Sequence, residues 1–335
     1  MSSLNPVNPS PIEILSDLSR RRERPVLLYA NGPFSPETTS ILHDGLRHQG
    51  LVERLDLVLQ SGGGDPRTSR SLGVLLRSFT QHLCILVPEY AVSAATLLCL
   101  AADELILTPL SRLSPLDPQV LSEAAAPTPQ AGQERRAGPR SISTEEVRVF
   151  REMARTWFGI GESTEENALL LQTLCQRIFP TTLTTIYRAD QEMRANADEL
   201  LRSHEPDPAT RARICDQLIS GFWSHSHAIH REEARELGLP VRDATPEEEE
   251  CLSRFHAWSR SYLQSTIAEP EEPETLLKVA AVLAGPGFAF HYVTPVAKAG
   301  EEQPPANASR SSGWRPMVPT SFPNERGEPP CPSGK

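Results

Sequence analysis

The chain has 335 residues, of which 39% are hydrophobic and 23% are charged, so it is long and apolar enough to bury a core and is not disordered throughout. Its formal net charge of −10 excludes a global basic field of the kind that holds nucleic acid. Only three of the 33 basic residues are lysines, namely Lys278, Lys298 and Lys335, which leaves few positions for a catalytic lysine.

Six cysteines are scattered along the chain without any C-x-x-C spacing, so we expect no zinc ribbon and no thioredoxin-like motif. Several lie in apolar runs, which is typical of buried thiols in a reducing compartment and favours a cytoplasmic location. The most apolar segment, residues 83–107, is interrupted by Pro88 and by Asp103. We therefore expect no membrane span, and the first residues predict no secretory signal.

Alternating strands and helices are predicted up to residue 107, after a flexible lead at residues 1–19. Short apolar runs predict the strands, and apolar residues at helical spacing predict the helices between them. The predicted strands are 26–30, 55–59, 83–87 and 104–107, and the predicted helices are 36–49, 67–80 and 93–102. Strands that alternate with helices in this way predict an α/β fold with a mainly parallel sheet.

The second half of the chain has helical periodicity and no further series of strands. A polar, low-complexity stretch at residues 122–141 predicts a mobile loop. Helices are predicted at 143–157, 164–177, 181–202, 208–220, 230–237 and 246–266. We expect one domain at residues 20–245, an added C-terminal helix at 246–267, and a largely disordered tail at 268–335, which is rich in proline and glutamate.

Three glycines, Gly62, Gly63 and Gly64, directly follow the second predicted strand. Glycine permits positive φ and lets another backbone approach closely. The run matches neither the G-x-x-x-x-G-K-[ST] phosphate loop nor the G-x-G-x-x-G dinucleotide fingerprint. It is therefore either a tight turn from strand to helix or a ledge of backbone amides that faces a developing oxyanion.

Ser93 stands between the third predicted strand and an apolar helix. Serine is a favoured N-cap residue, so a capping role alone would explain its position. A hydroxyl at a helix N-terminus also lies near the positive end of the helix dipole, which makes it a candidate nucleophile. In that second interpretation the amide of Ala94 points at the same oxyanion as the glycine run.

Three histidines, His225, His227 and His230, gather in one segment. The H-x-H-x-x-H spacing could ligate a metal, although no cysteine or second ligand group stands at a recognisable spacing. The charged residues that follow fit a solvated surface equally well. A catalytic histidine is the third interpretation, and the spacing alone does not separate the three.

Three motifs in this order resemble the serine dehydrogenase proteinase family, which belongs to the wider group of Clp proteases, signal peptide peptidase A and crotonases. They read LDLVLQSGGGDP, VPEYAVSAATLLCLAADELILTPLSRLSPLDPQ and SHSHAIHREEARELGLPV, and the resemblance covers about residues 20–245. It implies an α/β fold that is a crotonase/Clp-like spiral of β-β-α units, here with an added C-terminal helical region. It also implies that Ser93 is the nucleophile and that Gly63, Gly64 and Ala94 form the oxyanion hole.

The resemblance leaves the catalytic base open, because the lysine used by signal peptide peptidase A has no counterpart in the matched region. In Clp-type relatives a histidine follows the serine by about two dozen positions and an aspartate lies far downstream. Here Asp117 occupies the first place, and His225 or His227 falls near the second. A triad is defined by geometry and not by chain order, so we expect Ser93, a histidine and Asp117, with His227 slightly favoured over His225.

These expectations describe an ATP-independent serine peptidase without metal or cofactor that cleaves peptides or proteins and forms a homo-oligomer, as its relatives do. The alternative is an inactive scaffold or interaction protein on the same fold. That alternative is favoured by Ala95, where the family commonly has glycine, and by the missing proline before the glycine pair. Acyl-CoA chemistry of the crotonase kind is a weaker third candidate, since the chain offers few lysines for the phosphates of the coenzyme.

Overall fold

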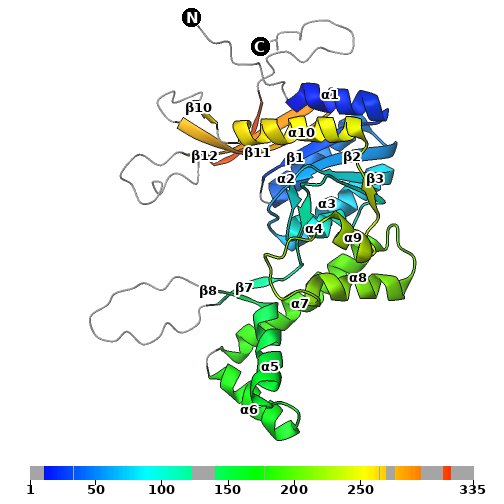
Figure 1. Ribbon diagram of the computed structural model, residues 1–335. Coiled ribbons are helices and arrows are strands. Elements are labelled where there is room, and N and C mark those ends of the chain that lie inside the picture. The colour runs from blue at the N-terminus through cyan, green and yellow to red at the C-terminus, as the bar shows by residue number, and fades with distance from the viewer. Residues whose placement is uncertain are drawn as a thin grey trace, which may run out of the picture.

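The computed structural model describes residues 11–32, 34–122, 140–176, 178–263, 265–268, 276–295 and 312–317. A nine-stranded sheet forms its centre (Figure 1). The strands follow the order β13-β12-β11-β1-β2-β3-β5-β9, and β10 pairs with β11 outside that path.

The sheet has a parallel half and an antiparallel half. The parallel half consists of β1 (Val26–Ala30), β2 (Val52–Gln60), β3 (Thr80–Val87), β5 (Glu104–Leu107) and β9 (Val241–Asp243). The antiparallel half begins beside β1 and consists of β11 (Leu276–Gly285), β12 (Phe288–Pro295), β13 (Gly313–Pro316) and β10 (Thr266–Ala268).

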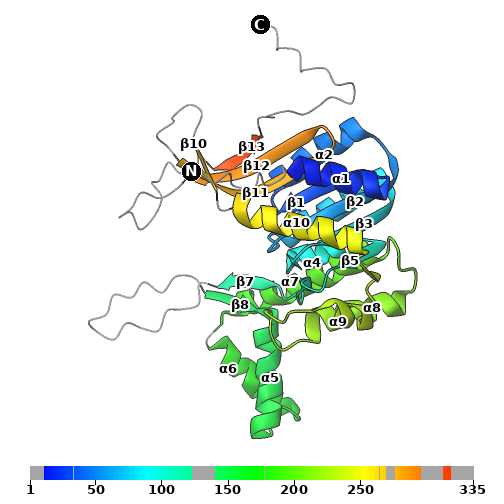
Figure 2. The ribbon, with the colours of Figure 1, turned by 45° about the horizontal axis from the view of Figure 1, so that its top comes forward.

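Helices cover both faces of the sheet. The helices α1 (Pro11–Arg22) and α10 (Pro246–Tyr262) lie together on one face, and α2 (Pro36–Gln49), α3 (Pro66–Phe79) and α4 (Ala94–Cys99) lie on the other (Figures 1 and 2). In β1, Val26 and Leu28 pack in the cluster under α1 and α10, whereas Leu27 and Tyr29 pack in the opposite cluster. Successive strand residues point to opposite faces, so a continuous apolar run fits a strand that is buried on both sides.

A second group of helices lies beyond α3 and α4. The helix α7 (Pro180–Leu201) packs on α3, and α8 (Pro208–Ser220) packs on α7. The helix α9 (Arg231–Glu236) precedes β9, while α5 (Thr144–Phe158) and α6 (Thr164–Cys175) extend away from the sheet (Figure 1). A β-carbon at Gly73 of α3 would lie only 2.7 Å from Leu200 Cδ2, so the missing side chain is what lets α7 approach.

Short bridges join the segments that follow the long strands. The strands β4 (Tyr90–Ala91) and β6 (Arg112–Leu113) form a parallel pair. Isolated bridges link Phe34 to Gly64, Ser61 to Ala91, and Leu113 to Ile229. A separate antiparallel pair consists of β7 (Gln119–Ser122) and β8 (Arg140–Ser143). The bridges therefore align the loops that carry the glycine run and Ser93.

The predicted α/β architecture is confirmed, and the predicted strands and helices are present with ends within a few residues. Two expectations are wrong. Residues 11–19 belong to α1, whose Ile14 and Leu18 are buried, and not to a flexible lead. The tail expected from residue 268 contains β11, β12 and β13.

Most of the predicted loop, residues 123–139, lies outside the described residues. The first ten residues and residues 318–335 also lie outside them. Within the described ranges, none of the helices combines the length and the apolar character that a membrane crossing requires.

Buried ion pairs fasten α1 and α10 to the sheet. Arg22 of α1 pairs with Asp56 of β2 and with Glu248 of α10. Arg242 of β9 pairs with Glu104 at 2.7 Å and with Glu248 at 2.9 Å. Burial raises the pKa of the Asp56 carboxyl, although the hydrogen bond and charge of Arg22 act against this. Loss of one partner would leave an uncompensated buried charge.

The variant Arg22→Met should lower the free energy of unfolding by up to about 3–5 kcal/mol at neutral pH, because the buried Asp56 keeps only Arg24, at 3.4 Å, as a partner. The loss of unfolding free energy should be smaller at about pH 4, where more of the Asp56 carboxyl is protonated. A carboxyl with a raised pKa in the folded state stabilises the fold below its unfolded pKa and loses that contribution as the pH rises through its folded pKa. Urea denaturation at both pH values measures the difference. The exposed Arg20→Met is the control, and an equal loss at both pH values would contradict the role of Asp56.

Candidate active site

Ser93 lies at a sharp turn between β4 and α4. Its backbone has φ 56° and ψ −124°, and a residue with a side chain adopts such a conformation only at a cost of about 1–3 kcal/mol. Among the described residues, its side chain makes no capping hydrogen bond with α4, so the capping interpretation finds no support. Strained strand-to-helix turns of this kind expose the nucleophilic serine in other hydrolase folds.

Hydrogen bonds to buried hydroxyl groups hold this turn in place. The amide of Ser93 donates to Ser114 Oγ at 2.7 Å, and the amide of Ser114 donates to Thr96 Oγ1 at 3.0 Å. Thr96 Oγ1 in turn donates to the carbonyl of Ala91 at 2.7 Å. Because Ser114 and Thr96 are buried, water does not compete for these bonds, and the turn is fixed.

The glycine run passes directly against the turn. Gly63 has φ 96°, and a β-carbon there would lie 2.8 Å from the amide nitrogen of Ala94 and from the carbonyl oxygen of Val92. Gly64 has φ 144°, and its β-carbon would lie 2.6 Å from the amide nitrogen of Phe34. Both positions therefore require glycine, because a side chain would separate the two backbones.

The amides beside Ser93 differ in their partners. The amide of Gly63 donates to Ser61 Oγ at 3.1 Å, and this hydroxyl donates to the carbonyl of Gly32 at 3.1 Å. The sequence predicts Gly63 as an oxyanion donor, but in this structure its amide already has an acceptor inside the loop. No hydrogen-bond acceptor among the described residues faces the amide of Gly64 or that of Ala94.

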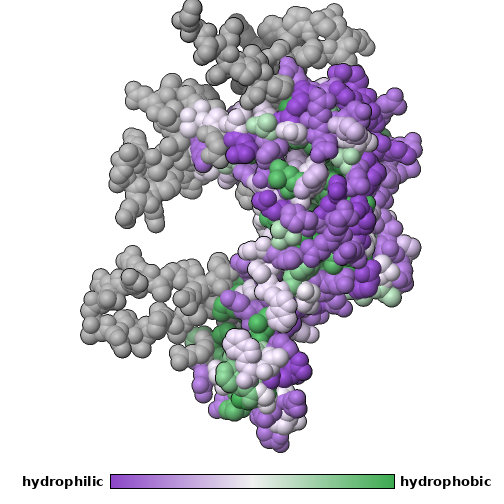
Figure 3. All heavy atoms as spheres, in the orientation of Figure 1, coloured by the Kyte–Doolittle hydropathy of each residue, from purple (hydrophilic) through white to green (hydrophobic). Residues whose placement is uncertain are grey.

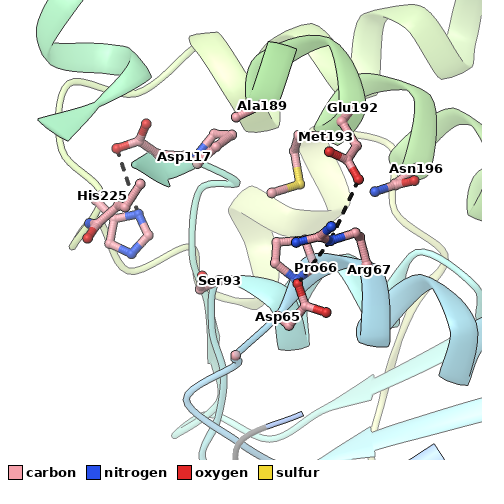
Figure 4. Close-up of a pocket in the computed structure, with 13 residues that line it drawn as sticks. Asp65, Pro66, Arg67, Ser93, Asp117, Ala189, Glu192, Met193, Asn196 and His225 are labelled. Atoms are coloured by element: carbon pink, nitrogen blue, oxygen red, sulfur yellow. Dashed lines mark ion pairs between the residues drawn. The ribbon is translucent and has the colours of Figure 1, made fainter. Parts of the chain in front are cut away.

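A cavity of about 420 Å³ opens beside Ser93 (Figure 4). Its walls come from the N-terminus of α3, the Ser93 turn, the segment before β7, the helix α7 and the loop before α9. Its lining includes Gly64, Ser93, Asp117, Asn196 and His225. The fold thus brings the predicted serine, the predicted aspartate and one predicted histidine to a common cavity.

His225 is the histidine that faces Asp117. Its Nδ1 lies 3.9 Å from Asp117 Oδ2 and has no hydrogen-bond partner among the described residues. The other carboxylate oxygen, Oδ1, accepts from Thr144 Oγ1 at 3.0 Å and from the amide of Glu145 at 3.3 Å. Burial raises the pKa of Asp117, and the hydrogen bonds and the nearby imidazole oppose the rise. In Figure 4 the His225 ring is drawn between Asp117 and Ser93.

The other two histidines have different partners. His227 Nε2 lies 3.0 Å and 3.1 Å from the two oxygens of Glu233, and its ring stacks on Phe222. His230 Nδ1 lies 3.2 Å from the carbonyl of Ser111. The geometry therefore favours His225 over His227, the histidine that the sequence slightly favoured. The three side chains also do not converge on one point, and no group of three or more metal-ligating side chains is found in the described part of the chain.

None of the described residues that line the cavity is a lysine. Lys278 is exposed on β11, in the antiparallel half of the sheet, and Lys298 and Lys335 lie outside the described residues. The imidazole of His225 is therefore the candidate base that lines the cavity with Ser93.

Sequence reasoning missed the residues that support the site. Ser114, Thr96 and Ser61 carry no catalytic motif, and each acts through a contact with a segment distant in the sequence. Their only signal is the clustering of small hydroxyl residues near the ends of strands. Nothing in the sequence says which backbone group each hydroxyl meets.

Part of the chain matches a known family. Residues 41–149 match the family model of the ClpP-like SDH-type serine proteinase. This match covers the first two of the three motifs and confirms the resemblance there, and it shows that the segment with the glycine run, Ser93 and Asp117 is similar to a serine-type proteinase family. His225 lies beyond the matched residues.

Two curated relatives come from Methanocaldococcus jannaschii. The uncharacterized protein MJ1495 is 23% identical over 57% of this chain and 53% of its own length, and the uncharacterized protein MJ0137 is 25% identical over 60% and 58%. The chain thus spans little more than half the length of these relatives. Two solved structures of variants of the 1510-N membrane-bound stomatin-specific protease are also similar, each with a TM-score of 0.38 and an alignment that covers 72% of this chain. One variant is 12% identical over 84% of its own length. The other variant, in complex with a substrate peptide, is 13% identical over 80% of its own length.

The variant Gly63→Ala should lower the free energy of unfolding by about 1–3 kcal/mol. The new residue would have to adopt a positive φ, and its β-carbon would lie 2.8 Å from two backbone atoms. Gly62→Ala is the matched control. No described heavy atom lies within 4 Å of a β-carbon at Gly62, so its effect should stay within about 0.5 kcal/mol. Urea denaturation followed by circular dichroism compares the two, and equal stability would show that the loop does not press on the Ser93 turn.

Proposed function

We propose that this chain is a serine peptidase in which Ser93 is the nucleophile, His225 is the general base and Asp117 orients the imidazole. Ser93 Oγ attacks the carbonyl carbon of a peptide bond while His225 accepts the hydroxyl proton. The same imidazole then gives this proton to the leaving amine. Water repeats the sequence on the acyl-enzyme and regenerates Ser93.

One observation carries the proposal. The strained turn directs Ser93 to the same cavity as the pair of His225 and Asp117. Strain of this kind persists only where surrounding contacts impose it, and it gathers at functional sites. A serine that served only as a helix cap would use an unstrained conformation and would bond to the helix amides.

The backbone amides of Gly64 and Ala94 are the proposed oxyanion donors. Both lie beside Ser93, because the glycine run packs against the turn, and neither amide has a described acceptor. An oxyanion receives its strongest stabilisation from donors that are already aligned before the reaction. Gly63 contributes by close approach and not by its amide, which bonds to Ser61.

The distance of 3.9 Å between His225 and Asp117 is longer than a hydrogen bond. Catalytic hydrogen bonds are often loose before substrate binds and tighten in the complex. The side chain of His225 is 32% exposed and that of Asp117 is 4% exposed, so the imidazole is the partner with room to turn. Asp117 is held by Thr144 and Glu145 and serves as the fixed end of the pair.

The substrates in this proposal are peptides or proteins, and the chemistry requires no cofactor. The repeated order of strand, short bridge and helix supports the spiral of β-β-α units implied by the family resemblance. The five described cysteines are free, which supports the reducing, cytoplasmic compartment suggested by the composition.

A fluorophosphonate probe should label the wild-type chain at Ser93, and Ser93→Ala should abolish both labelling and peptide hydrolysis. His225→Gln should slow both by about 10²–10⁴-fold, because the base is lost. His227→Gln is the matched control and should leave both rates close to wild type, since its partner is Glu233. Intact mass and peptide mapping identify the labelled residue.

The inactive scaffold is the outcome if folded wild-type protein is neither labelled nor hydrolytic. The extra methyl of Ala95 does not by itself favour that outcome. Ala95 is fully buried in the core, and its amide donates to the carbonyl of Val92 at 3.0 Å. The position thus accommodates alanine within an intact turn. Equal loss of labelling in His225→Gln and His227→Gln would remove the assignment of the base.

We also propose that the chain forms a homo-oligomer through the region of α5, α6 and the start of α7. Hydrophobic residues gather over α5 and α6 on the face drawn in Figure 3. Exposed large apolar side chains in this region are Trp157, Phe158, Leu169, Leu171, Phe179 and Tyr187. Apolar patches of this kind mark association surfaces.

Sedimentation velocity should therefore show a species larger than one chain, and Trp157→Glu together with Leu169→Glu should shift it toward the monomer. Trp157 is 75% exposed, so the change costs the folded chain little. The exposed pair Glu165→Gln and Arg20→Gln is the control. A wild-type protein that stays monomeric at micromolar concentration would refute the proposed assembly.

A further inference from the structure

Asn196 of α7 is a buried polar side chain with an unused donor. Its exposure is 7%, and its Nδ2 has no hydrogen-bond partner among the described residues. It lines the same cavity as Ser93, and in Figure 4 its amide lies on the side of the cavity that Arg67 and Glu192 also border. Buried polar groups are nearly always paired, and an orphan in a native fold calls for an explanation.

The surroundings of Asn196 limit what its amide can bind. Met193 and Ala189, from the same helix, add apolar surface to the cavity. Arg67 lies at the rim, with its Nε 3.5 Å from Asp65 Oδ1 and 4.0 Å from Glu192 Oε1. The guanidinium is thus already placed between two carboxylates.

We propose that this part of the cavity selects a peptide substrate that carries glutamine or asparagine next to the scissile bond, with the side-chain carbonyl oxygen accepting from Asn196 Nδ2. This inference rests on the proposed peptidase function and adds the class of substrate. Gly64 and Ser93 line the same cavity, so a side chain that enters it belongs to a residue beside the attacked carbonyl.

Charge and hydrogen bonding argue against charged and against purely apolar side chains. A carboxylate would enter a cavity that already holds Asp65, Asp117 and Glu192 against the single guanidinium of Arg67. An ammonium or guanidinium group cannot accept from Nδ2. A purely apolar side chain would leave the buried donor unpaired. A neutral carbonyl acceptor satisfies the donor without adding charge.

The test separates binding from chemistry by measuring peptide affinity on the Ser93→Ala variant of the full chain. Two matched peptides carry glutamine or methionine at the variable position, because methionine has a similar length and no carbonyl. Two further peptides carry glutamate and lysine. The glutamine peptide should bind about tenfold more tightly than the methionine peptide, the scale of one hydrogen bond to a buried donor.

Asn196→Leu, added to Ser93→Ala, should remove this preference without lowering the urea midpoint of unfolding, since Nδ2 makes no hydrogen bond with the described residues. A structural asparagine would instead lower that midpoint. Gln191→Leu, an exposed neighbour on α7, is the control and should keep the preference. The inference is overturned if glutamine and methionine bind equally, if glutamate or lysine binds best, or if the preference survives Asn196→Leu.

Labelling of wild-type Ser93 by the fluorophosphonate probe is scored separately. Selective binding without labelling overturns the peptidase and keeps the recognition site. Labelling without selective binding overturns the recognition site and keeps the peptidase.

Discussion

The candidate site depends on one close approach, in which the backbone of Gly63 passes within van der Waals distance of the turn at Ser93 and Ala94. Two conditions make it feasible. Glycine removes the side chain that would separate the two segments, and the buried hydroxyls of Ser114 and Thr96 hold the turn in its strained conformation. The proposed roles of Ser93 and of the amides at Gly64 and Ala94 depend on this contact.

Local patterns were enough to predict the elements, the glycine run and Ser93, because strand and helix periodicity, turn glycines and helix starts are encoded over a few residues. The choice between His225 and His227 could not be made, since the two stand two positions apart and only the path of the loop decides which one meets Asp117. The strand β11 was missed because an apolar run is embedded in a region whose proline and glutamate content suggests disorder. The role of α1 was missed because its apolar residues pack against α10, which is distant in the sequence.

The wall of the cavity opposite Ser93 belongs to a different part of the fold from the sheet. It is formed by α7, which packs against α3 at Gly73. The sheet half thus supplies the proposed nucleophile and the proposed backbone donors, while the helical half supplies Asn196 and its neighbours.

The pairing of α1 with α10 has a consequence for synthesis on the ribosome. The helix α1 can bury its apolar face fully only when residues 246–262 have also been translated. At the same late moment Arg22, which pairs with Asp56, gains its ion pair with Glu248. The nascent chain therefore carries Ser93 long before the imidazole and the last covering helix arrive. In the proposed peptidase, the site stays incomplete until the segment that carries His225 has left the ribosome.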